Sequence, residues 1–149
     1  MEKSFSCLAQ TRQNILAIYE KHEEKAFVIP KGFKNHLFWN LAHCLVTQQI
    51  LCYKLSGKPM LIDNNFVEKY KKGTVPSLEI VSPYEVSKTK ELLFTTIEQI
   101  RADYRFGVFS SFKEYTTSYG ISLNSFGDAI QFNNIHESLH LGYMMAMVK

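Results

Sequence analysis

The sequence predicts an all-α fold in which a single domain forms a bundle of four long helices. Four stretches of the chain place apolar residues at the three- and four-residue spacing of a buried helix face. Segments containing Pro, Gly, Ser and Asn separate these stretches, and we find no βαβ unit and no internal repeat. A chain of 149 residues fits one domain and is long enough to bury one substantial core.

The first two helices are predicted over about residues 7–25 and about residues 35–55, with a break at 27–32 that contains Pro and Gly. Asn35 is a suitable N-cap for the second helix. The buried face of the first helix is predicted to comprise Leu8, Arg12, Ile15, Leu16 and Tyr19. The inward face of the second helix is predicted to include Trp39, His43, Val46 and Ile50.

Residues 59–81 show no sustained helical period and are predicted to form a long connection, with a short helix near 65–72. In a bundle, a long crossover allows two neighbouring helices to run parallel. The third helix has a clear start, because Ser82 can act as its N-cap, Pro83 suits its first position and Glu85 completes a capping box.

The fourth helix is predicted to begin at Ser125, with Asp128 as the acidic partner of a second capping box, and to run to the end of the chain. Before it, residues 108–123 are rich in aromatic side chains, and Gly120 ends any turn they form. We expect a substrate to enter over the aromatic part of this segment, Phe109–Tyr119.

The fourth helix carries His136 and His140, four residues apart and therefore on one face of the helix, so both imidazoles can reach one metal ion. With Glu137 they spell H-E-x-x-H, the helix motif of zinc proteases. Such proteases usually take a third ligand from downstream, but residues 141–149 contain no His, Asp or Glu. We therefore predict that the protein is not a peptidase, and that any third ligand comes from upstream.

His43 is the upstream candidate, because it lies mid-helix among apolar neighbours. Burying an unpaired polar group costs on the order of 1–3 kcal/mol, and one divalent cation would satisfy three imidazoles at once. The alternative is that the three are separate core histidines with their own hydrogen bonds. His36 lies about 10.5 Å along the helix axis from His43, in the first turn, where we expect exposure or a capping contact instead.

Glu137 lies about 100° around the helix from His136. Its carboxylate can either reach a water molecule at the metal or pair with a lysine on a neighbouring helix. We expect a structural role, either in such a pair or in orienting a ligand histidine. Asn133 continues the face of His136 and His140 backward, and Tyr143 continues it forward.

Composition argues against several function classes. The formal net charge of +3 is too small to indicate a nucleic-acid surface. No signal peptide pattern and no apolar run long enough to cross a bilayer is found, so we expect a cytoplasmic protein with no membrane partner. The cysteines, Cys7, Cys44 and Cys52, lack metal-binding or pairing patterns and are expected to be reduced, with Cys44 filling the core.

Two segments resemble motifs of the DinB-like superfamily. Residues 39–45, from Trp39 through His43 to Leu45, resemble its W-x-x-x-H-L helix, and residues 136–142 resemble its closing H-E-x-x-H-x-G segment. Gly73-Thr74-x-Pro76 in the crossover agrees too. The resemblance implies an up-up-down-down four-helix bundle with a divalent metal held by His43, His136 and His140. Nickel or zinc is the expected ion, with iron or manganese as further candidates.

The resemblance also implies a function. Members of the family with a known activity resemble thiol-dependent S-transferases or metal-dependent hydrolases. The resemblance therefore implies a small-molecule substrate, and a low-molecular-weight thiol is one candidate for it. The alternative is a non-catalytic bundle whose metal is structural or sensing. Four side chains are expected around the ligands or in the pocket: Glu137, Tyr143, Trp39 and Asn133. Tyr143 stands where the family commonly has Gln.

The resemblance further implies a homodimer, since such dimers are common in the family. The chain also has more aromatic and methionine side chains than four core faces need. Those expected to contact the partner are Met145, Phe94, Phe109 and Phe112.

Overall fold

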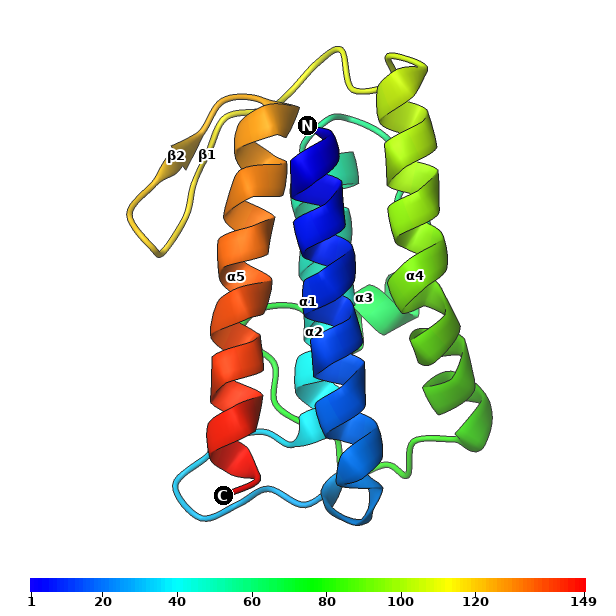
Figure 1. The fold of residues 1–149 in the computed structure, drawn as a ribbon, viewed down its shortest axis with the longest axis vertical. Helices are drawn as coiled ribbons and strands as arrows, with labels where there is room; N and C mark the ends of the chain where they lie inside the picture. Colours follow the sequence, from blue (N-terminus) through cyan, green and yellow to red (C-terminus); the bar gives the residue numbers. More distant parts are fainter.

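The computed structural model describes all 149 residues and shows four long helices packed side by side (Figure 1). These are α1 (Glu2–Lys21), α2 (Leu37–Gln49), α4 (Pro83–Arg105) and α5 (Phe126–Met147). The short helix α3 (Asn64–Tyr70) lies in the long connection, as predicted. The minor elements are the 3₁₀ turn η1 (Glu23–Lys25), the π-helical turn η2 (Ile50–Lys54) that extends α2, and the strands β1 (Tyr115–Thr116) and β2 (Ser122–Leu123).

The all-α class is therefore confirmed for everything except a small β-ribbon. Strands β1 and β2 pair antiparallel, with Tyr115 opposite Leu123, inside the segment for which the sequence predicted only aromatic residues and a turn. In Figure 1 this ribbon stands beside α5. Two-residue strands are too short to show the alternation of buried and exposed residues by which a strand is predicted.

The helix directions differ from the expected up-up-down-down order. Figure 1 shows α1 and α5 running one way and α2 and α4 the other, which is an up-down-down-up order. Side-chain contacts agree: Asn134 Nδ2, in the first half of α5, donates to Ser4 O near the start of α1, as expected for parallel helices. Asn40, near the start of α2, contacts Met147 at the end of α5, so these two are antiparallel.

The two connections explain this order. After α1 the chain turns back at the end of the bundle, where Ala26 is buried and its carbonyl accepts a hydrogen bond from Phe38 N (3.1 Å). Only the connection between α2 and α4 runs the length of the bundle, and these two helices are parallel, which a long crossover allows but the expected up-up-down-down order did not include.

The predicted starts of the last two long helices are confirmed. Ser82 Oγ accepts a hydrogen bond from Glu85 N, and Ser125 Oγ accepts one from Asp128 N, both at 3.1 Å. The capping box of α4 is only half formed, because the Glu85 carboxylate instead accepts from Tyr70 Oη at 2.6 Å. Glu85 therefore joins α4 to α3.

The first two long helices begin at other residues than predicted. Helix α1 starts at Glu2 rather than near residue 7, and α2 is capped by His36 rather than by Asn35. The buried face of α1 matches the prediction, including Arg12, which is fully buried. Helix α2 is buried almost all round, because α1, α3, α4 and α5 all pack against it.

All three cysteines are free thiols, and Cys44 lies in the core as expected. Burial raises the pKa of the Cys44 thiol well above its usual range. No helix of the structure has the length and apolar character that a membrane span requires.

Candidate metal centre

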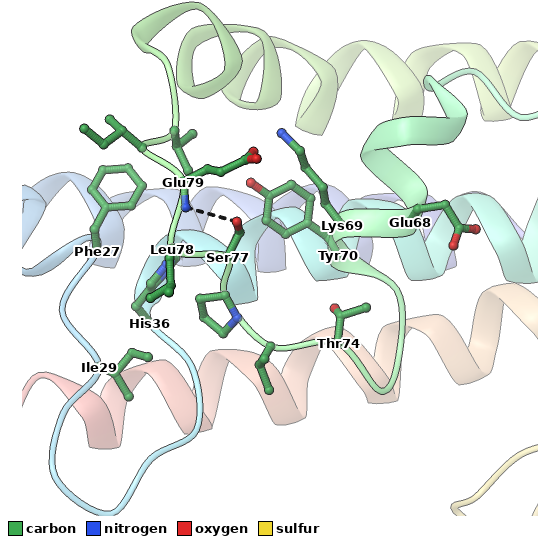
Figure 2. Close-up of a pocket in the computed structure, with 14 residues that line it drawn as sticks. Phe27, Ile29, His36, Glu68, Lys69, Tyr70, Thr74, Ser77, Leu78 and Glu79 are labelled. Atoms are coloured by element: carbon green, nitrogen blue, oxygen red, sulfur yellow. Dashed lines mark hydrogen bonds between the residues drawn. The ribbon is translucent and has the colours of Figure 1, made fainter.

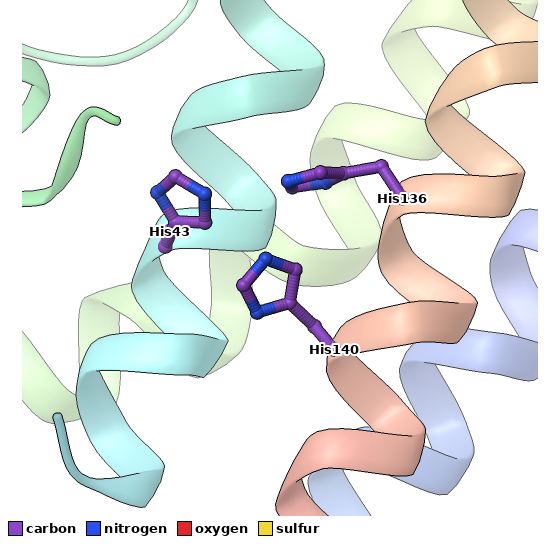
Figure 3. Close-up of side chains that lie close together, drawn as sticks. All are labelled: His43, His136 and His140. Atoms are coloured by element: carbon purple, nitrogen blue, oxygen red, sulfur yellow. The ribbon is translucent and has the colours of Figure 1, made fainter. Parts of the chain in front are cut away.

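Three histidines from two helices meet inside the bundle (Figure 3). Helix α2 supplies His43, and the adjacent antiparallel α5 supplies His136 and His140. One ring nitrogen from each residue can be chosen so that all three lie within 4.8 Å of one another. The spacing of four residues on α5 brings two imidazoles to one face, and the middle of α2 lies level with them. The prediction that these three histidines come together is confirmed.

His36 does not belong to this cluster. Its Nδ1 accepts a hydrogen bond from Trp39 N at 3.0 Å, so the imidazole caps the start of α2. A capping contact was one of the two expectations for His36, and the other, exposure, is wrong because the residue is buried. Burial lowers the pKa of His36 to about 4, which keeps Nδ1 free to accept the bond.

The ring of His43 is held by three neighbours. Its Nδ1 donates to the carbonyl oxygen of Tyr70, the last residue of α3, at 2.6 Å. Since a carbonyl can only accept, this bond places the proton on Nδ1 and leaves the lone pair on Nε2. Trp39 stacks on the ring with centroids 4.5 Å apart, and Thr47 Oγ1 lies 3.3 Å from Nε2.

Asn40 orients His140 in the same way. Its Oδ1 accepts from His140 Nδ1 at 2.8 Å, which leaves Nε2 of His140 with a lone pair. Asn40 is fully buried, and its Nδ2 donates to Asn35 Oδ1 (2.7 Å) and to His36 O (3.0 Å). These two acceptors fix which way the amide points.

His136 has no such partner. Its Nδ1 is buried and makes no hydrogen bond. Burial, then the nearby His140 and His43, lower the pKa of His136 to about 2. Burial also lowers the pKa of His43, and it lowers that of His140 to about 4 with a further contribution from His43. All three imidazoles are therefore neutral near pH 7, the form in which histidine binds a metal.

The residues present fit a divalent metal ion. Two of the imidazoles donate from Nδ1, the usual arrangement of ligand histidines, and the third has an orphaned buried nitrogen. The Nε2 of His140 is free, and the Nε2 of His43 accepts only from the Thr47 hydroxyl at 3.3 Å, a bond that a metal ion would replace. No Cys, Asp or Glu joins the cluster. A structural zinc site usually has four protein ligands, whereas three histidines leave a coordination position open.

A cavity of about 410 Å³ lies against the cluster. Besides the three histidines, its lining comes from α2 and η2, from the residues that follow α3, from α5 and from the β-ribbon. The lining residues are Thr47, Ile50, Leu51, Leu55, Lys71, Lys72, Tyr115, Thr117, Ser118 and Phe132. A small molecule in this cavity would therefore contact the histidines directly.

The sequence model of the DinB superfamily, as a protein family, matches residues 8–144, a span that includes all three histidines. This chain belongs to the DinB superfamily. A search of the curated proteins finds no match to it.

In this DinB-superfamily chain, Glu137 is turned away from the three histidines. Its carboxylate is fully buried and pairs with Arg12 of α1, with Arg12 Nη2 and Glu137 Oε1 2.8 Å apart. Asn133 Nδ2 donates to the same oxygen at 2.9 Å. The structure gives Glu137 a structural role, but neither of its expected partners is right, because the carboxylate pairs with Arg12 and contacts neither a lysine nor a ligand histidine. The arginine on the otherwise apolar face of α1 was the signal for the actual partner.

Of the other three residues expected around the ligands or in the pocket, only Trp39 contacts a ligand histidine, and none lines the cavity. Trp39 stacks on His43, as described above. Asn133 is buried beside Glu137 rather than in the cavity lining. Tyr143 is exposed and packs edge-on against Phe33, with ring centroids 5.0 Å apart, so it does not line the cavity either.

Asn40, Thr47 and the carbonyl of Tyr70 were not among the site residues predicted from the sequence. A polar residue at position 40, one turn before His43 in an apolar helix, was a usable signal for a buried partner. Nothing in the sequence could have shown the carbonyl, because every residue has one.

A larger cavity, about 610 Å³, lies where the residues following α3 pass the start of α2 (Figure 2). There the chain bends at Ser77, whose Oγ accepts from Glu79 N at 3.0 Å. The only histidine of this cavity is His36, and its Nδ1 is already used in the cap. The smaller cavity is therefore the candidate functional site.

Proposed function

We propose that this chain binds one divalent metal ion through His43, His136 and His140, and that the site is the active centre of an enzyme acting on a small molecule. One observation supports this most strongly: three neutral imidazoles face a cavity of about 410 Å³, with no fourth protein ligand beside them. A structural metal would not need the cavity, so the arrangement favours an enzyme over a non-catalytic bundle.

When bound, a metal with three histidine ligands and an open position supplies a Lewis acid that can activate water or a thiol. Nickel or zinc is the proposed ion, with iron or manganese as further candidates, because imidazole suits several of these ions. The chain's own residues hold the ligands: Asn40 and the Tyr70 carbonyl fix two rings, and Trp39 covers one face of His43.

We propose hydrolysis or thiol S-transfer as the reaction class, consistent with membership of the superfamily. Thr47 Oγ1, within 3.3 Å of His43 Nε2, is placed to hydrogen-bond a substrate group at the metal. Peptide cleavage by the H-E-x-x-H mechanism is not proposed. That mechanism needs the glutamate as a base at the metal, and here the Glu137 carboxylate is enclosed with Arg12.

The homodimer also remains a proposal. Met145 is exposed, as a partner contact requires, whereas Phe94, Phe109 and Phe112 pack partly against the protein's own core. Light scattering that returns a dimer mass at micromolar concentration would support it, and the 17.3 kDa monomer mass would overturn it.

The test of the proposed function begins with metal analysis. The purified protein, reconstituted with nickel or zinc and then desalted, should retain one ion per chain, while His136→Ala should retain none. The metal-loaded protein is then screened for hydrolysis of activated esters and for transfer of a thiol to an electrophile. Turnover that is lost with chelator and in His136→Ala supports an enzyme. Metal retention without turnover in either screen would favour the non-catalytic alternative.

A further inference from the structure

The charged residues around the site cavity are all of one sign. Apart from the histidines, its only ionisable lining groups with a charge at neutral pH are Lys71 and Lys72, and no carboxylate lines it. The nearby Glu137 is enclosed with Arg12. A bound divalent metal would add two more positive charges. Such a cavity concentrates anions, since charges of one sign in a cleft raise the local concentration of the opposite ion.

The two lysines are held in place by residues of the metal site. They directly follow Tyr70, whose carbonyl accepts from His43 Nδ1. On their other side, Thr74 Oγ1 donates to the Lys71 carbonyl (2.8 Å) and accepts from Trp39 Nε1 (3.3 Å). Gly73, between Lys72 and Thr74, has a φ of +88°, a backbone conformation that residues with a side chain rarely adopt.

These bonds attach both ends of the 70–74 loop to α2, at His43 and at the Trp39 ring that stacks on it. The loop therefore forms a fixed rim beside the histidines. Lys72 forms no ion pair, and Lys71 pairs with Glu68 at 2.6 Å on the surface. Exposed pairs of this kind are weak, so Lys71 can exchange its partner for a ligand.

The rest of the cavity is largely apolar. Ile50, Leu51 and Leu55 line it from the π-helical end of α2, and Phe132 lines it from α5. The β-ribbon adds the hydroxyl groups of Thr117 and Ser118. Its volume of about 410 Å³ falls within the range of pockets that hold small organic molecules.

We infer that Lys71 and Lys72 form an anion-binding rim, and that the site takes a small organic anion with an apolar body. This inference rests on the proposed function, since it names the substrate class of the same site. The apolar body lies against the π-helical turn and Phe132. The carboxylate or other anionic group is bound by the lysines, and the reacting group faces the histidines.

The test compares two double variants by calorimetric titration of the metal-reconstituted protein. The probes are phenylacetate and its neutral analogue phenylacetamide. The lysines are removed in Lys71→Met/Lys72→Met. The matched control, Lys31→Met/Lys34→Met, loses the same two charges from exposed residues outside the cavity. Metal content and melting temperature are measured for each variant first, so that a loss of metal or of folding is recognised.

We expect the wild-type protein and the control to bind phenylacetate more tightly than phenylacetamide. Loss of the two rim lysines should weaken phenylacetate binding about tenfold, with phenylacetamide unchanged, because each partly exposed charge contributes only a few-fold to the affinity. Equal phenylacetate affinity in the two double variants would overturn the inference, since the metal alone would then select the anion. Failure of every protein to bind phenylacetate would overturn it as well.

The metal analysis separates this inference from the function on which it rests. Wild-type protein that retains no metal contradicts the proposed function, whatever the titrations show. Protein that retains one metal per chain but treats both double variants alike contradicts only the anion rim. Charge reversal in Lys71→Glu/Lys72→Glu, with metal content unchanged, should abolish phenylacetate binding, and preserved binding would again overturn the inference.

Discussion

His136 and Glu137 are neighbours in the chain, yet their side chains belong to two buried polar clusters of opposite kinds. The cluster around Glu137 is complete in its charged groups: Arg12 donates to both carboxylate oxygens, to Leu93 O at 2.7 Å and to Thr96 Oγ1 at 3.1 Å, and only the neutral Asn133 Oδ1 beside the pair lacks a partner. The cluster around His136 is incomplete, because His136 Nδ1 is buried without a partner and a cavity lies beside it.

The difference shows how one helix can serve two purposes. Consecutive residues point about 100° apart, so α5 directs Glu137 between α1 and α4 and directs His136 toward α2. A satisfied buried pair holds helices together and has no capacity for a ligand. An unsatisfied group of neutral imidazoles can be stabilised by a metal. The motif H-E-x-x-H is thus divided between structure and chemistry.

The largest expected effect comes from breaking the complete cluster. Arg12→Ala should lower the free energy of unfolding by about 3–5 kcal/mol, because it leaves the Glu137 carboxylate buried without its counter-charge. Urea unfolding measures this loss. Arg105→Ala, which removes an exposed pair with Glu2, is the control and should cost under about 1 kcal/mol. Equal losses in the two variants would mean that the buried pair is not important for stability.

The next effect concerns the incomplete cluster. His43→Ala should abolish the rise in melting temperature on adding nickel or zinc. For the wild type, a metal at a hundredfold excess over its Kd adds about 2.7 kcal/mol of stability. His36→Ala is the matched control: it removes a helix cap at a cost of about 1 kcal/mol but should keep the metal response. A metal response that survives in His43→Ala and disappears in His36→Ala would contradict the site.

These two clusters also show what can be predicted from the sequence. The helices were predictable where local signals act, as at Ser82 and Ser125, whose side chains cap as expected. The order of helix directions was not, because it depends on where residues 22–36 pack. That connection is long enough to reach either end of the bundle, and the burial of Ala26 at the near end decides the direction.

For the site, the three histidines were predictable because helical spacing and an apolar context place them on buried faces. Their partners were less so. Arg12 lies on the predicted buried face of its helix, and Asn40 lies one turn before His43 in an apolar helix, but pairing them with Glu137 and His140 requires the register between helices. Lys71 and Lys72 depend on a loop whose path is fixed only by hydrogen bonds to α2.

The incomplete cluster should make the metal-free protein sensitive to acid. The folded-state pKa of His136 is lowered to about 2 and that of His140 to about 4, against about 6.5 in an unfolded chain. Between about pH 6 and pH 4 the unfolded state therefore binds more protons. The free energy of unfolding is therefore at its full value above about pH 6.5. It decreases as the pH is lowered, by up to about 1.4 kcal/mol per pH unit for each histidine.

Urea unfolding in the presence of chelator, at several pH values, measures this slope. His136→Leu should reduce the slope of the free energy of unfolding against pH by the contribution of one histidine, and it leaves the Arg12–Glu137 cluster unchanged. If His136→Leu and the wild type lose stability in parallel on acidification, His136 does not contribute to the acid sensitivity.

A smaller effect is expected from Asn40, which supports the cluster without facing the metal. Asn40→Leu removes the acceptor of His140 Nδ1 and should weaken metal affinity about tenfold to a hundredfold, the usual effect of removing such a partner. A competition titration with a metal indicator measures the affinity. Asn40→Asp restores an acceptor and should bind metal more tightly than Asn40→Leu. Wild-type affinity in Asn40→Leu would show that His140 needs no partner.

The smallest expected effect is the sharpest test that the two clusters are independent. The double variant Arg12→Met/Glu137→Met replaces the whole ion pair by apolar side chains, which avoids leaving one charge buried alone. If Glu137 has no role at the metal, the metal affinity of this folded variant should stay within about twofold of wild type, since distant sites that share no partners are usually additive within about 0.3–0.5 kcal/mol. This limit is expected because the Arg12 and Glu137 side chains contact no ligand histidine, although Glu137 is next to His136 in the chain. The same competition titration measures the metal affinity, with Asn40→Leu as the positive control. A loss as large as that of Asn40→Leu would join Glu137 to the metal site and restore the protease-like interpretation of the H-E-x-x-H motif.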